Sequence, residues 1–352
     1  MFWKSDWPLA QERLRAWWRR EGPALCVTAP KDEPWEDVPD PGPARDPEQF
    51  WSDLDWRLAS LVCSLSRTYF GGVAFPFVDT QIGPGSLGLF LGNEPGWAWD
   101  TVWYEPCIAD PSTHPPLTFQ ENRWLSLHLD FIRRAEALSE GRFLVGIPDL
   151  IENLDTLAQL REPQTLMEDL IERPEWVSEK IAEINRAYFE VFDRMYSLLS
   201  GGGNAFAAFQ IWGPGKTAKV QCDASAMISP AMFRRFVVPA LTEQCEWLDY
   251  SMYHLDGTQA IAHLDALLEI EALDAIEWTP QAGIERGGDP RWFDLYRRIR
   301  AAGKSVQAIE VLPEQVGPLV DSVGPEGLFM IVSAESEEQA RELEAAVHAD
   351  GC

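Results

Sequence analysis

Two short stretches of the chain carry side chains that could bind a metal ion or move a proton. The apolar run 250–254 ends at His254 and is followed by Asp256, and the run 272–277 ends at Glu277. An imidazole and two carboxylates can bind a divalent metal, and the same groups can act as general acids or bases. Each residue alone is more simply explained as a hydrogen-bonded or solvated group. The prediction of a site therefore depends on the three coming together.

The sequence between these residues predicts how they meet. The two apolar runs are typical of strands, and residues 258–268 have helical periodicity. In a β-α-β unit the two strands lie parallel, so their carboxyl ends share one edge of the sheet. We therefore expect His254, Asp256 and Glu277 on the same face of the fold.

The rest of the chain repeats this pattern. Core strands are predicted at 73–78, 142–147, 206–211, 218–222, 250–254, 272–277, 305–310 and 328–333. Helices are predicted at 49–70, 121–140, 153–160, 165–172, 174–199, 289–302, 314–323 and 336–348. Eight strands that mostly alternate with helices indicate an α/β fold, a (β/α)8 TIM barrel, whose active site lies at the carboxyl ends of the strands.

One domain is predicted for residues 1–352, because no shift in composition marks a boundary. Residues 1–48 are expected to form an N-terminal extension with a helix at 5–20 and a short strand at 24–28. The barrel would then occupy residues 49–352.

Polar residues stand at the ends of most predicted strands. Asp79 and Asp149 join His254 as candidate catalytic residues. Candidates for substrate binding are Asn153, Gln210, Cys222, Asp223, Trp278 and Glu310. Ser333 or Glu335 would be a fourth metal ligand. A pocket so rich in acids predicts a bound metal, a bound cation or carboxyl groups that stay protonated.

Composition excludes several classes of partner. The formal net charge of −27 disfavours nucleic acid and anionic membranes, which bind cationic surfaces. No apolar run approaches the roughly 18 residues of a membrane span, and the N-terminus does not resemble a signal peptide. The six cysteines include no C-x-x-C pair. These features predict a cytoplasmic protein with reduced thiols that acts on a small molecule.

Six segments resemble the uroporphyrinogen decarboxylase-like superfamily, which includes zinc- and cobalamin-linked methyltransferases. They are FPFVDTQIGPGSLGLFLG (75–92), GIPDLIENLDTLAQLRE (146–162), CDASAMISPAMFRRFVVP (222–239), YHLDG (253–257), AIEWTPQAG (275–283) and GLFMIVSAESEEQARELEAAV (327–347). The resemblance implies a TIM barrel, methyl transfer to or from a corrinoid (cobalamin) protein, and a homodimer. It is closer to the methyltransferase branch than to the haem-pathway decarboxylase. Asp79 matches the catalytic aspartate of that decarboxylase, but the region 24–40 lacks its substrate-binding arginines.

The resemblance also implies a metal set, with departures. The methyltransferases bind zinc through His-x-Cys and a later cysteine, and related methionine synthases add a glutamate. His254 matches that histidine, Asp256 replaces the first cysteine, Glu277 stands at the place of the glutamate, and no cysteine lies on the last strand. Oxygen ligands are harder than sulfur ligands. They suit manganese, iron, or zinc that also binds water, and such a metal would keep open positions for a substrate.

Three functions follow as hypotheses. The first is a cytoplasmic methyltransferase in which a divalent metal, zinc for preference, polarises a small substrate and the tryptophans near 97–103 contact a corrinoid protein. The second is a metal-assisted decarboxylase or lyase for a small acid. The third is a non-catalytic protein that binds a cationic methylamine in a cage of tryptophans and carboxylates.

Overall fold

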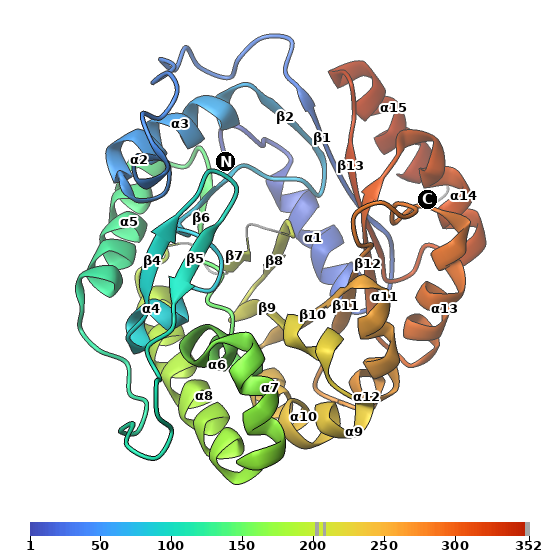
Figure 1. Cartoon of the computed structure of the whole chain (residues 1–352). Coiled ribbons are helices and arrows are strands. Elements are labelled where there is room, and N and C mark those ends of the chain that lie inside the picture. Colours follow the sequence, from blue (N-terminus) through green and yellow to red (C-terminus); the bar gives the residue numbers. More distant parts are fainter. Residues whose placement is uncertain (201–203, 207–208, 349–352) are drawn as a thin grey trace.

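A computed structural model describes residues 1–200, 204–206 and 209–348, and its core is a seven-stranded sheet in a mixed α/β fold (Figure 1). The strand order is β2-β1-β13-β12-β11-β10-β9. All neighbours in this sheet are parallel except β1 and β2. The strands are β1 (Ala24–Pro30), β2 (Thr68–Gly72), β9 (Thr217–Gln221), β10 (Tyr250–Asp256), β11 (Ala275–Thr279), β12 (Ser305–Val311) and β13 (Leu328–Ser333).

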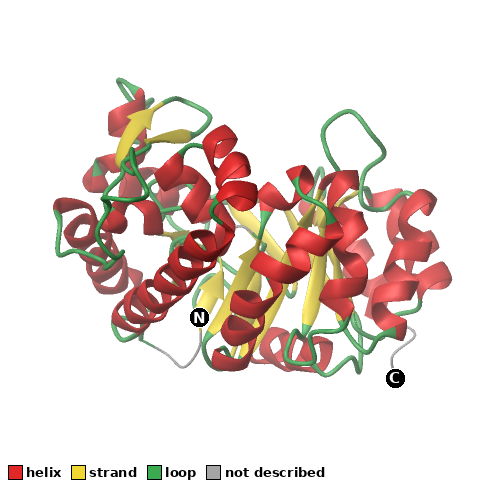
Figure 2. Ribbon diagram, turned by 60° about the horizontal axis from the view of Figure 1, so that its bottom comes forward, coloured by secondary structure: helices red, strands yellow, loops and turns green. Residues whose placement is uncertain are grey.

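Two smaller sheets complete the β structure. One has the order β3-β6-β7-β8, with β3 (Phe77–Asp79), β6 (Leu144–Gly146), β7 (Asn204–Phe206) and β8 (Ile211–Gly213). The other is a hairpin of β4 (Glu94–Trp97) and β5 (Val102–Glu105). Figure 2 shows the strands of the large sheet side by side with helices packed along them, and the hairpin standing apart.

Helices occupy most of the chain between the strands. They are α1 (Trp7–Trp18), α2 (Pro47–Ser52), α3 (Leu54–Ser66), α4 (Leu87–Leu91), α5 (Arg123–Ser139), α6 (Asn153–Arg161), α7 (Pro163–Glu172), α8 (Pro174–Tyr196), α9 (Pro230–Phe236), α10 (Val238–Trp247), α11 (Gly257–Ala260), α12 (Leu264–Leu268), α13 (Phe293–Ala301), α14 (Val316–Val323) and α15 (Glu337–His348). In the part of the chain described, no helix combines the length and apolar character needed to cross a bilayer.

The predicted N-terminal extension contributes to the large sheet. Strand β1 lies between β2 and β13, and its first four residues are all buried, as expected for an inner strand. Helix α1 lies among the strands in Figure 1 and is fixed by two indoles. Trp17 Nε1 donates to the carbonyl of Gly327 at 3.1 Å, and Trp18 Nε1 donates to that of Trp212 at 2.9 Å. Helix α1 and strand β1 are therefore integrated with the core, whereas residues 31–46 form an irregular, largely exposed segment.

The predicted helices between 121 and 199 and the predicted strands at 250–254, 305–310 and 328–333 are confirmed. The predicted strand 73–78 is wrong, because β2 ends before it and β3 starts within it. Gly72 ends β2 with φ +59°, a backbone conformation that glycine adopts readily, and a Cβ there would meet the Leu25 carbonyl. The predicted strand 206–211 spans residues 207–208, outside the described residues; on either side lie the antiparallel strands β7 and β8.

Candidate metal and acid–base site

Three possible metal ligands gather at the carboxyl ends of β9 and β10. His254 and Asp256 are two residues apart on β10 and therefore lie on the same face of the sheet. Asp223 follows β9, the neighbour of β10. One ligand atom from each of the three residues can be chosen so that all lie within 4.8 Å of one another. Asp223, predicted as a substrate-binding residue, thus takes the place in this group that the sequence assigned to Glu277.

Glu277 lies behind His254. Its Oε2 atom is 2.5 Å from His254 Nδ1, and its Oε1 atom accepts a hydrogen bond from Thr279 Oγ1 at 2.7 Å. The two residues are register partners on β10 and β11, and Glu277 is fully buried. Both carboxylate oxygens are engaged, so Glu277 fixes the ring of His254 and leaves Nε2 available to a ligand. Burial alone would lower the pKa of His254, but the charge of Glu277 outweighs this and raises it.

A buried lysine connects this group to the second sheet. Lys219 Nζ on β9 lies 2.9 Å from Asp149 Oδ2, beyond the end of β6, and also donates to Gln221 Oε1. Burial by itself lowers the pKa of Lys219, but Asp149 and Glu152 outweigh it, so the pKa is raised. The lysine is therefore cationic, and it neutralises part of the acidic charge at the strand ends.

Two acids that the sequence analysis missed hold the segment carrying Asp223. Glu152 Oε1 accepts from the backbone N–H of Gln221 at 2.6 Å. Asp155 accepts from the backbone N–H groups of Asp223 at 2.7 Å and Ala224 at 2.8 Å. Burial raises the pKa of Glu152 to about 8. The spacing of three residues between Asp149, Glu152 and Asp155 was the available signal, because it places all three near the start of α6.

The carboxyl groups of Asp79 and Asp223 bind protons more tightly than usual. Desolvation raises the pKa of Asp79 to about 6, against opposing effects of the Gln81 N–H and Arg57. The pKa of Asp223, which lies at the solvent surface, is also raised to about 6, first by partial desolvation and then by Asp155. Asp79 pairs in register with Gly146 at the end of β6, so it lies near Asp149. Both predicted catalytic acids are therefore on the same edge of the second sheet.

Replacing Asp79 with asparagine is expected to stabilise the protein at alkaline pH. The folded state keeps the proton of Asp79 up to pH about 6, whereas the unfolded chain releases it near pH 4. The tighter proton binding of the folded state therefore stabilises it fully at low pH. This stabilisation is lost as the pH rises from about 4 through about 6. Urea unfolding should show Asp79→Asn more stable than wild type by about 1–3 kcal/mol at pH 8, with the gain absent near pH 4. No gain is expected for the surface variant Asp110→Asn; a gain of the same size at both pH values would contradict this reasoning.

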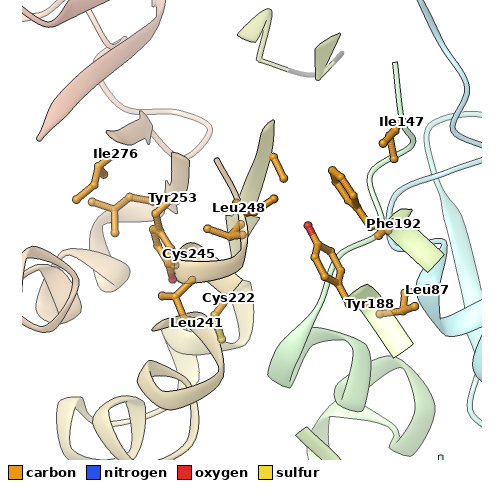
Figure 3. Close-up of a cluster of buried hydrophobic side chains, with 14 of the residues drawn as sticks. Leu87, Ile147, Tyr188, Phe192, Cys222, Leu241, Cys245, Leu248, Tyr253 and Ile276 are labelled. Atoms are coloured by element: carbon orange, nitrogen blue, oxygen red, sulfur yellow. The ribbon is translucent and has the colours of Figure 1, made fainter. Parts of the chain in front are cut away.

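Three residues predicted to bind substrate lie in the core. Asn153 is buried and its Nδ2 donates to Gln244 Oε1 at 2.8 Å. Cys222 lies in the buried cluster with Leu241, Cys245 and Tyr253 that Figure 3 shows, and burial raises its pKa well above the usual value. Trp278 is fully buried, with its ring 4.8 Å from that of Trp292. The sequence could not show their neighbours from other elements, which are a polar partner for Asn153 and apolar side chains for Cys222 and Trp278.

The remaining predicted residues lie on other elements than Asp223, His254 and Asp256. Gln210 is half-buried just before β8, next to Phe209, whose ring centroid is 5.0 Å from that of His254. Glu310 and Ser333 line a separate cavity at the ends of β12 and β13. Glu335 is exposed, and its backbone N–H donates to Gln339. Glu335 does not belong to the group of possible metal ligands found among the described residues.

Comparison with known proteins supports the fold. No protein-family model matches the chain, and no curated protein matches it. Among solved structures, the chain is similar to a methyltransferase from Methanosarcina mazei, with a TM-score of 0.59 and 11% sequence identity. The match covers 97% of this chain and 98% of that one. The two proteins share a fold over nearly their whole lengths, and at this identity the likeness extends to the fold alone.

Proposed function

We propose that the chain is a metal-dependent methyltransferase of the uroporphyrinogen decarboxylase-like superfamily, and that its two main sheets together form a (β/α)8 barrel. The likeness to the archaeal methyltransferase over nearly the whole chain supports this proposal, as do the six resembling segments. The pairing of β1 with β13, the first and last strands, is consistent with a barrel.

The observation that carries the proposal is the gathering of Asp223, His254 and Asp256. One imidazole and two carboxylates fit zinc, manganese or iron, and three protein ligands leave positions open for a substrate. A metal bound there would act as a Lewis acid on the heteroatom that carries or receives the methyl group. Glu277 supports this assignment, because a metal-binding histidine typically donates its other ring N–H to a carboxylate.

The other residues of the site have roles in binding and proton transfer. Asp79, with a pKa of about 6, exchanges a proton near neutral pH, which suits a general acid or base. Asp149 and Lys219 form an ion pair that orients polar groups of the substrate. The excess of acids in the site favours a substrate or leaving group with positive charge.

We extend the proposal to a corrinoid protein as methyl donor or acceptor. Trp99, in the loop between β4 and β5, and Trp103, on β5, have exposed fractions of 55% and 69%. Phe50 contacts the ring of Trp99, with centroids 6.2 Å apart, and holds it in place. Such exposed flat rings suit contact with a flat corrinoid or the protein that carries it.

The test measures metal content and methyl transfer together. The full chain is purified without chelators, reconstituted with zinc, manganese or iron, and mixed with reduced cobalamin and methylated amines, thioethers or methanol. We expect one metal per chain and a change in the visible spectrum of cobalamin that a chelator abolishes. Glu277→Gln should reduce transfer by roughly 10–100-fold, because it weakens the orientation of His254.

The control is Glu269→Gln, the same substitution at an exposed residue that pairs with Arg234. It should leave both the metal content and the transfer rate unchanged. A wild-type protein that retains no metal after reconstitution and transfers no methyl group would refute the proposal.

A further inference from the structure

A recess lies on the same edge of the large sheet as the metal group. Its volume is about 330 Å³, and it lies at the carboxyl ends of β12 and β13, which run parallel to β10. Its polar lining consists of Arg286, Glu310 and Ser333, and the remainder is aliphatic side chains and backbone from β12, β13 and the residue after β12. A recess of this size suits part of a small molecule.

Arg286 and Glu310 line this cavity without neutralising each other. Among the residues that the structure describes, neither side chain forms a hydrogen bond or an ion pair. The nearby Arg291, by contrast, bonds to Glu285 at 2.5 Å. Both side chains are exposed, so they are solvated and free to pair with charged groups of a ligand. The cavity thus offers one positive and one negative group to a ligand.

The backbone around the cavity is unusual in two places. Glu310 has φ +54°, which is unfavourable for a residue with a Cβ, and the register of β12 with β13 shifts between Ala308 and Val311. A Cβ on Gly287 would lie 2.2 Å from the carbonyl oxygen of Ile309, so only glycine allows this close approach beside Arg286. Strain of this kind persists where the structure holds a residue in position, often at ligand sites.

The loop that carries Arg286 also connects the cavity to the metal group. Gln281 Oε1, in the same loop, accepts from the backbone N–H of Thr258 at 3.0 Å and from its Oγ1 at 2.8 Å, just beyond the end of β10. Adjacent strands are about 4.8 Å apart, so two to three strand spacings separate the cavity from His254, or about 10–15 Å. A small extended molecule can span this distance.

We propose that the cavity binds the zwitterionic head of the substrate, with a carboxylate on Arg286 and an ammonium group on Glu310. The substrate class is then a small amino-acid-like zwitterion whose methyl-bearing end extends past β11 towards the metal group. Guanidinium–carboxylate pairing provides the orientation, and the hydroxyl of Ser333 adds a further polar contact. The direction of the methyl-bearing end rests on the proposed function, whereas the recognition of the two charges rests on the cavity alone.

The test uses three probes that share a methylthio end and differ in charge. They are L-methionine with both charges, 3-(methylthio)propionate with only the carboxylate, and 3-(methylthio)propylamine with only the ammonium. Calorimetric titration of the full chain, with and without metal and without cobalamin, should show L-methionine binding most tightly. Arg286→Gln should weaken the binding of L-methionine and of the propionate at least about tenfold and leave the binding of the amine unchanged. Glu310→Gln should weaken the binding of L-methionine and of the amine and leave the binding of the propionate unchanged.

Arg291→Gln is the matched control and should bind all three probes as the wild type does. Equal affinity of the wild type for the three probes, no binding of any, or unchanged L-methionine binding in both cavity variants would overturn the inference. Charge-selective binding without methyl transfer would contradict the proposed function alone. Methyl transfer without preference for the zwitterion would contradict only the inference about the cavity.

Discussion

His254→Ala is expected to lose its metal and to lose more methyl-transfer activity than the roughly 10–100-fold expected for Glu277→Gln. The substitution removes the only nitrogen donor of the group and leaves Glu277 buried without its partner. The metal content per chain is measured by plasma mass spectrometry. The transfer rate is measured with reduced cobalamin. His114→Ala is the control, because His114 is a half-buried histidine in the loop before α5 and is not a member of the metal group. It should retain both metal and activity.

Comparing metal affinity in Asp223→Asn and Glu277→Gln tests which of the two acids binds the metal. Asp223→Asn removes a proposed ligand, whereas Glu277→Gln changes a residue that acts through His254. Metal affinity should therefore fall further in Asp223→Asn than in Glu277→Gln. The sequence alone predicts the reverse, since it places Glu277 among the ligands. Full metal content in His254→Ala would exclude this site, and a larger loss in Glu277→Gln would restore the ligand set predicted from sequence.

Lys219→Met is expected to lower the free energy of unfolding by about 3–5 kcal/mol at pH 7. The side chain of Lys219 is almost entirely buried, and its removal takes from Asp149 the ion pair that it forms among the described residues, with other acids nearby. Charges left unpaired at a buried site are costly, because neither water nor a counter-ion compensates them. Urea unfolding followed by tryptophan fluorescence measures the change.

Lys216→Met is the matched control for this effect. Lys216 lies just before β9 and pairs at 2.7 Å with Asp193, whose side chain is half exposed. Lys216 Nζ also lies 4.0 Å from the centroid of the Trp247 ring. A surface ion pair contributes roughly 0–1 kcal/mol and a cation–π contact about 0.5–1 kcal/mol, so the control should be destabilised less than Lys219→Met. Equal losses in the two variants would show that Lys219 contributes no more than this partly exposed lysine.

The unit from β10 to β11 was predictable because its signals are local. Alternating burial on β10 sets His254 and Asp256 on one face, and the parallel register with β11 brings Glu277 beside His254. Sequence reasoning could not predict that Asp223 lies near them. It follows a different strand, and its position depends on the hydrogen bond that its backbone N–H donates to Asp155, which is 68 residues away in the chain.

Dependence on contacts between distant residues also explains the errors in the predicted fold. Helical periodicity located α5, α7 and α8, because each of these helices buries a stripe of its own residues, whereas α6 is buried on nearly all sides. The place of β1 between β2 and β13 leaves no local signal, because it depends on a pairing between the two ends of the chain. Likewise, the burial of Cys222 and Trp278 depends on neighbours from other elements, which a strand pattern does not specify.

The union of β1 with β13 has a consequence for the order in which the protein can be assembled on the ribosome. The bond from Trp17 Nε1 to the Gly327 carbonyl joins residues 310 positions apart, and β1 pairs with β13 across a similar interval. Contacts between such distant residues form slowly. Until β13 has been translated, β1 has an unpaired edge of apolar residues, which favours association with other chains. A nascent chain of this kind depends on protection of its first strand for nearly the whole of its synthesis.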